Sequence, residues 1–73
     1  MNTTLKWHLE IIDWNAISEK KYGGDIFLNT KIENFFTLEE VWKFIGGKLK
    51  KNRFGYSGIR NNIEYRLTKY SFY

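Results

Sequence analysis

Residues 37–49 read TLEEVWKFIGGKL, and this segment carries the clearest helical pattern in the chain. Thr37 is a favourable N-cap, and Glu40 three residues later completes a capping box. Apolar side chains recur at helical spacing and form one stripe: Leu38, Val41, Trp42, Ile45 and Leu49. Gly46–Gly47 interrupts this stripe, at a cost of about 2 kcal/mol if both glycines are helical. Either the helix ends there or another backbone passes close by. Because Leu49 continues the stripe, we expect the helix to reach about Lys50.

Residues 53–70 contain the pattern of a β-hairpin. Asn61–Asn62 suits a two-residue turn with positive φ, which pairs Arg60 with Ile63. In this register one face is apolar and is expected to join the core: Phe54, Tyr56, Gly58, Ile63, Tyr65 and Leu67. The other face is expected to meet solvent: Arg53, Ser57, Ile59, Glu64, Arg66, Thr68 and Tyr70.

The first 32 residues predict two more strands. Apolar and polar residues alternate over residues 5–11, and a bulge or the strand end is expected where Ile11–Ile12 and then Trp14 break the alternation. A polar connector over residues 15–24 leads to a second expected strand, residues 25–32, which would pair with the first as an antiparallel hairpin. We therefore expect one compact domain, 1–73, of the α+β class. Its order would be ββαββ, with a four-stranded, mainly antiparallel sheet in one layer and one helix packed on one face in the other.

Composition excludes several kinds of site. With no Cys, the 73-residue chain forms neither a disulfide scaffold nor a thiolate zinc site. The single His, His8, together with Glu10 and Asp13, lacks the spacing of a known metal site. Ser57 lies in Gly-Tyr-Ser-Gly, which is not the nucleophile elbow of hydrolases. We expect no catalytic residue, cofactor or metal, and therefore no enzyme. Without a leader or an apolar run long enough for a membrane span, we expect a cytoplasmic protein.

Charge is distributed unevenly along the chain. Residues 1–42 hold four Lys and seven acids, whereas residues 43–73 hold five Lys, three Arg and one acid, for a net charge of +4. A basic half predicts an anionic partner, because Lys and Arg neutralise phosphates while exposed rings stack on bases. We expect nucleic acid or a nucleoprotein complex to bind at Lys48, Lys50, Lys51, Arg53, Arg66, Lys69 and Tyr70. Alternatively, these cations are a favourable helix C-terminus and a solvated face, or the acidic half neutralises them.

A second class of function is binding to a protein. In size and composition the chain resembles the small inhibitors carried by phages and plasmids, including anti-CRISPR and toxin-immunity proteins. Its net charge of +4 differs from the acidic DNA mimics among them. The resemblance implies a protein that binds and blocks a nucleic-acid-processing enzyme. Aromatic residues anchor interfaces, so the candidate contacts are Trp14, Tyr22, Phe72 and Tyr73. A homodimer through an edge strand ending in the aromatic tail is also possible.

Overall fold

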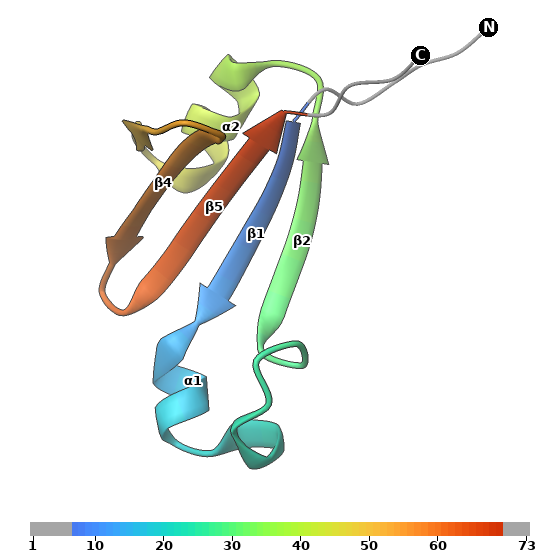
Figure 1. Ribbon diagram of the computed structural model, residues 1–73, viewed down its shortest axis with the longest axis vertical. Coiled ribbons are helices and arrows are strands. Elements are labelled where there is room, and N and C mark those ends of the chain that lie inside the picture. Colours follow the sequence, from blue (N-terminus) through green and yellow to red (C-terminus); the bar gives the residue numbers. More distant parts are fainter. Residues whose placement is uncertain (1–6, 70–73) are drawn as a thin grey trace, which may run out of the picture.

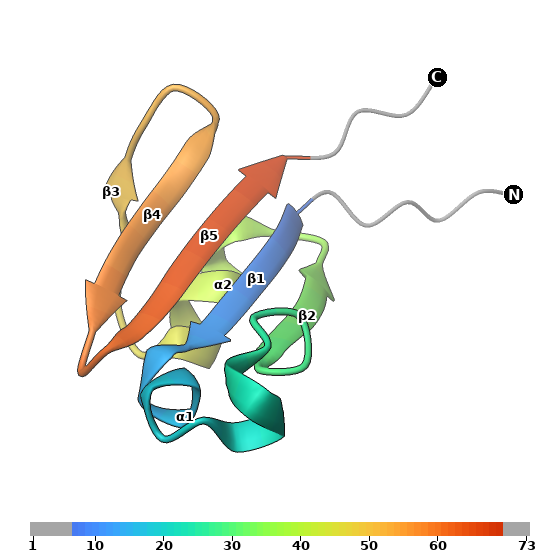
Figure 2. The same ribbon diagram turned by 60° about the horizontal axis from the view of Figure 1, so that its bottom comes forward.

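The structure, a computed structural model, describes residues 7–69 and contains five strands in one antiparallel sheet. The elements in chain order are β1 (Trp7–Asp13), α1 (Trp14–Ser18), the 3₁₀ turn η1 (Lys21–Gly24), β2 (Thr30–Phe35), α2 (Leu38–Ile45), β3 (Lys50–Lys51), β4 (Gly55–Arg60) and β5 (Ile63–Lys69). The strands lie side by side as β2-β1-β5-β4-β3. Figures 1 and 2 show α2 across one face of this sheet and α1 at one end. The α+β class is confirmed. The expected ββαββ order and four-stranded sheet are not confirmed, because β3 makes a fifth strand and α1 lies between β1 and β2.

The core lies between α2 and the centre of the sheet. Leu9 of β1 is opposite Leu67 of β5, and both are almost completely buried with Val41 of α2. Leu49 joins this cluster from the segment between α2 and β3. Burying each such side chain contributes roughly 1.5–3 kcal/mol. Large rings close the rim, where Tyr56 packs edge-on against Trp42 with ring centroids 5.0 Å apart.

Helix α2 begins as the sequence predicts and ends earlier. The capping box between Thr37 and Glu40 is present, with the Glu40 amide donating to Thr37 Oγ1 at 3.3 Å. Gly46 adopts the left-handed conformation (φ 76°), and its N–H donates to the Trp42 carbonyl at 2.9 Å. The expected continuation to Lys50 is therefore wrong. The left-handed glycine ends the helix, and Leu49 reaches the core from extended chain instead.

The C-terminal hairpin has the predicted register. Asn61 and Asn62 both have positive φ, and the turn pairs Arg60 with Ile63. The same register brings Tyr56 opposite Leu67, on the face covered by α2. The prediction that Phe54 joins this face is wrong, because β4 begins only at Gly55 and the Phe54 side chain is 75% exposed.

The N-terminal strands pair antiparallel as predicted, but β2 begins five residues later than the expected strand. Asp25 Oδ1 accepts the N–H groups of Phe27 and Leu28 at 2.8 and 3.1 Å, which closes a turn. The buried Asn29 side chain fixes that turn by donating to the carbonyls of Lys21 and Asp25. Side chain–backbone bonds of this kind compete with strand pairing. Residues 26–28 are therefore exposed.

Strand β1 runs through Ile11 and Ile12 and ends at Asp13, directly before Trp14, in agreement with the expected strand end and without a bulge. Asp13 then caps α1 by accepting the Ala16 N–H at 3.1 Å. Strand β5 lies between β1 and β4, so the expected free edge on the strand leading to the aromatic tail does not exist. Among the described residues, no helix is long and apolar enough to cross a membrane.

Two glycines of β4 form a matched test of the close packing between β4 and β5. A Cβ added at Gly55 (φ 154°) would collide with the Leu67 carbonyl oxygen, whereas one added at Gly58 would meet only Leu49 Cδ2 at 3.1 Å. We expect Gly55→Ala to lower the free energy of unfolding by about 2–3 kcal/mol, because alanine there meets a backbone oxygen and is strained by the positive φ. We expect Gly58→Ala to lower it by less than about 1 kcal/mol, because the Leu49 side chain can rotate away. Urea denaturation followed by tryptophan fluorescence measures both, and equal losses would contradict the packing.

Candidate functional site

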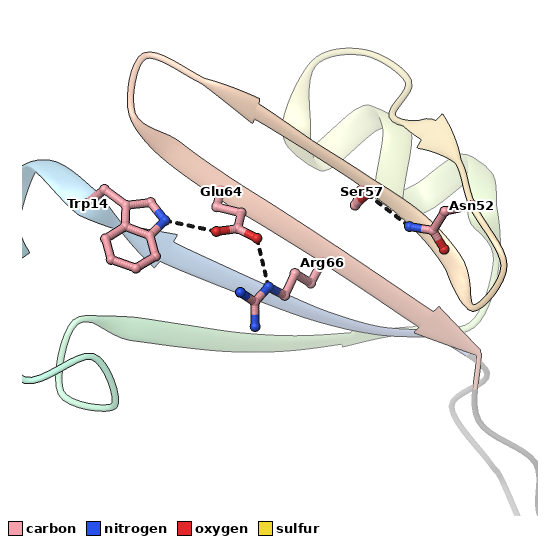
Figure 3. A network of polar contacts seen from close by, with 5 residues as sticks. All are labelled: Trp14, Asn52, Ser57, Glu64 and Arg66. Atoms are coloured by element: carbon pink, nitrogen blue, oxygen red, sulfur yellow. Dashed lines mark hydrogen bonds and ion pairs between the residues drawn. The ribbon is translucent and has the colours of Figure 1, made fainter.

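The turn between β3 and β4 is held by the side chain of Asn52. Its Oδ1 accepts the N–H groups of Phe54 and Gly55 at 2.8 and 2.9 Å, and its Nδ2 donates to Ser57 Oγ at 2.9 Å. The Asn52 N–H also donates to the Gly55 carbonyl at 2.8 Å. Figure 3 shows the Asn52–Ser57 contact between the turn and β4. With both ends of the turn tied, Arg53 and Phe54 project into solvent from a fixed backbone.

Cations lie close to Phe54 along the chain. Lys50 and Lys51 form β3, directly before the turn, and are exposed like Arg53. We call residues 50–54 the basic turn. No Asp or Glu occurs in the sequence between Glu40 and Glu64. Within residues 7–69, the ion pair present is that of Glu64 with Arg66, so the cations of the basic turn are left unneutralised by it.

Arg66 lies on the open face of the sheet, opposite α2, and forms an ion pair with Glu64. Its Nε is 2.7 Å from Glu64 Oε2, while Trp14 Nε1 donates to Glu64 Oε1 at 2.9 Å. Figure 3 shows the three side chains in line across β1 and β5. The hydrogen bond from Arg66 lowers the pKa of Glu64, against an opposing effect of burial and with a smaller contribution from Trp14. The same contact raises the pKa of Arg66. Half of the Arg66 side chain nevertheless remains exposed.

A shallow hollow links Arg66 to the basic turn. Ser57 and Arg66 are directly opposite in the β4–β5 ladder. The hollow has a volume of about 280 Å³, and its polar and aromatic lining includes Asn52, Phe54, Ser57, Glu64, Arg66 and Thr68. A ligand lying in this hollow would contact Phe54 at the turn, and Arg66 and Thr68 on β5.

The remaining predicted contacts are more scattered. Lys48 is exposed between α2 and β3, and Lys69 lies at the end of β5, with Nζ 6.0 Å from the centre of the Trp7 ring. Trp14 is half-buried, and its Nε1 donates to Glu64. Tyr22 is 60% exposed. Tyr70, Phe72 and Tyr73 lie outside the described residues.

Sequence patterns missed two exposed features. Phe54 was assigned to the core by strand alternation, and only the Asn-x-x-Gly spacing of Asn52 and Gly55 hints at a turn there. The second feature is an apolar tip at the end of the molecule that holds α1, with Phe27 85% and Leu28 63% exposed beside Tyr22. The alternation of residues 26–32 had placed Leu28 within a strand.

Residues considered for metal binding or catalysis have structural partners. His8 Nδ1 lies 3.2 Å from Asn34 Oδ1 across β1 and β2, and Asp13 caps α1. Over residues 7–69, no three side chains of His, Cys, Asp or Glu are grouped to hold a metal ion. Ser57 Oγ accepts its bond from Asn52. The basic turn is thus the best-defined candidate site in the described chain.

Replacing Glu64 by Gln tests the network that holds Arg66. Because the pKa of Glu64 is lowered in the folded protein, its ion pair stabilises the fold above the ordinary value of 4.5 and is lost as the pH falls through the lower folded value. We expect Glu64→Gln to cost about 0.5–1 kcal/mol at pH 7 and almost nothing in strong acid. Urea unfolding at several pH values measures the difference. Exposed Glu19→Gln is the charge-matched control, and a loss in Glu64→Gln that does not change with pH would contradict the ion pair.

Comparison of the chain with protein-family models, with curated proteins and with solved structures found no match.

Proposed function

We propose that this protein is a small, cytoplasmic, non-enzymatic module that binds nucleic acid, alone or in a nucleoprotein complex, through the basic turn. The observation that carries the proposal is the exposed ring of Phe54, held beside Arg53 on a turn whose backbone is fixed by Asn52. The Phe54 side chain is 75% exposed, so its ring is available to a partner.

The chemistry of the turn suits a single strand. Lys50, Lys51 and Arg53 supply positive charge for phosphates, and the release of counterions drives such binding. The Phe54 ring offers a face on which an unpaired base stacks, worth roughly 1–3 kcal/mol. A base inside a duplex is already stacked on both sides, so the ring favours single-stranded nucleic acid. The hollow leading to Arg66 gives the strand a path along the open face.

Preorganisation strengthens this proposal. Asn52 makes its side-chain bonds within the turn and to Ser57, so the backbone carrying Phe54 is ordered before a ligand arrives. Ordering a loop on binding costs free energy, and a turn that is already fixed avoids this cost. Arg66 contributes less, because Glu64 neutralises it.

Fluorescence anisotropy of labelled single- and double-stranded oligonucleotides, at low and physiological salt, measures the proposed binding. Three phosphate contacts predict a slope of about −2 for the logarithm of the binding constant against the logarithm of salt concentration on a single strand. We expect Phe54→Ala to weaken single-strand binding about tenfold or more, and Phe54→Trp to retain it, because stacking is lost in one and kept in the other. Arg53→Ala removes one phosphate contact and should make this slope less negative by about 0.7.

Two variants at the other end of the molecule serve as matched controls. Phe27 is also an exposed phenylalanine, and Lys20 is an exposed lysine. At the end that holds α1 (Figure 1), Phe27→Ala makes the same change as Phe54→Ala, and Lys20→Ala removes one positive charge as Arg53→Ala does. Both should bind oligonucleotides as the unchanged protein does. Absence of binding at low salt, or equal losses in Phe27→Ala and Phe54→Ala, would reject the basic turn as the binding site.

The apolar tip favours a second candidate function, the small inhibitor that binds a nucleic-acid-processing enzyme. Tyr22, Phe27 and Leu28 are exposed together on a segment that Asp25 and Asn29 hold in place. Exposed aromatic anchors on a fixed loop are typical of protein interfaces. In a pull-down with purified candidate enzymes, Phe27→Ala would abolish capture under this alternative and Phe54→Ala would not. The two functions therefore predict opposite results from the same pair of variants.

A further inference from the structure

The two edges of the sheet differ in length and chemistry. Strand β3 forms one edge, and it has only two residues, both lysines. Short strands and lysine side chains are common protection against edge-to-edge pairing. Strand β2 forms the other edge, is six residues long and contains Thr30, Lys31, Ile32, Glu33, Asn34 and Phe35. Figures 1 and 2 show β2 at the margin of the sheet, with no helix or strand on its outer side in the described part of the chain.

The β1–β2 ladder fixes which backbone groups of β2 face outward. Asp13 stands opposite Asn29 when the register of the ladder is continued, and the Asp13 N–H donates to the Asn29 carbonyl at 3.0 Å. Hydrogen-bonded and non-bonded pairs alternate along an antiparallel ladder. The backbone groups of residues 31, 33 and 35 therefore face β1, and those of residues 30, 32 and 34 face away from it. The outward N–H of Thr30 donates to the Phe27 carbonyl at 3.2 Å, so the open groups are the Thr30 carbonyl and both groups of Ile32 and Asn34. The outward backbone edge is centred on Ile32.

We propose that a second copy of this chain pairs with β2 in an antiparallel register centred on Ile32. A two-fold axis at Ile32 sets Ile32 opposite Ile32 of the second copy and Thr30 opposite its Asn34. The Ile32 and Asn34 N–H groups and the Ile32 and Thr30 carbonyls supply the bonds, because the Thr30 N–H already donates within its own chain. The axis also sets Lys31 opposite Glu33 of the second copy, and the symmetry makes this pair occur twice. Opposite charges directly across an antiparallel pair stabilise it by roughly 0.2–1 kcal/mol each.

Charge excludes the neighbouring registers. If the second copy moves along β2 by one residue, outward backbone groups lie opposite inward ones, and the ladder cannot form. A shift by two in one direction sets Lys31 against Lys31 of the second copy. A shift by two in the other direction sets Glu33 against Glu33. Like charges directly opposite destabilise a strand pair, so the sequence of β2 selects the Ile32-centred register.

An apolar contact at the axis adds to this selection. Ile32 is 53% exposed on the open face, and the proposed pairing brings it against Ile32 of the second copy. Residues 31 and 33 lie on the face that carries α2, so the ion pairs and the isoleucine contact occupy opposite faces of the joined sheet. The interface is small, so we expect a weak dimer that forms only at high protein concentration.

Sedimentation equilibrium over a range of protein concentrations tests the dimer. The unchanged protein should approach twice its mass of 8.8 kDa at high concentration. Lys31→Glu and Glu33→Lys should each weaken dimerisation by about tenfold or more, because two attractive pairs become repulsive. The double variant Lys31→Glu with Glu33→Lys restores opposite charges and should dimerise like the unchanged protein. Mixing the two single variants should produce a heterodimer, since acidic and basic edges then meet.

Ile32→Pro tests the backbone contacts separately from charge. Its N–H faces away from β1, so proline removes a donor of the dimer and leaves the β1–β2 ladder intact. We expect a monomer whose circular dichroism spectrum matches that of the unchanged protein. A protein that is monomeric at all concentrations would overturn the proposal, and so would a dimer that both single charge reversals leave intact. These results do not depend on oligonucleotide binding, because β2 and the basic turn are on opposite edges of the sheet.

Discussion

The pairing of Leu9 with Leu67 beneath α2 determines how the rest of the molecule is arranged. These two residues bring the first and last described strands together at the middle of the sheet, where Val41 completes the cluster. Once β1 and β5 are central, β2 and the β3–β4 pair can join only at the outer sides. Because α2 covers one face, the other face is left to polar contacts such as that between Glu64 and Trp14. Both proposed binding surfaces are consequences of this arrangement.

Local chemistry explains how much of the fold was predictable. The start of α2 and the register of the last hairpin depend on neighbours in sequence, the capping box at Thr37 and the turn at Asn61–Asn62, and both were predicted correctly. The end of α2 was not, because apolar spacing continued past the glycine that stops the helix. The order of the strands was not predictable either, since nothing in the alternation of residues 5–11 says which strand lies beside them.

For the candidate site, the sequence predicted the charged residues but not their arrangement in space. Lys50, Lys51 and Arg53 were identified from composition, but β3 is too short to leave a pattern. Phe54 fitted the alternation of its strand and still lies outside it, because Asn52 turns the backbone just before Gly55 approaches Leu67. Formal charge also overstated the basic surface. Arg60 donates to the Ile45 carbonyl at the C-terminus of α2, and Arg66 is neutralised, so two of the three arginines have structural roles.

The central position of β5 also bears on how the chain is synthesised. Leu9 leaves the ribosome early, while the strand that covers it, Ile63–Lys69, is the last described element to be made. Until then β1 has only β2 beside it, and its apolar face has no opposite leucine. Sheets closed by contacts between distant parts of a chain fold slowly, because the intervening loop must be ordered first. The nascent protein therefore acquires its complete core only after translation of β5. A chain that stops before Ile63 leaves the edge of β1 unpaired and Leu9 without Leu67 opposite it.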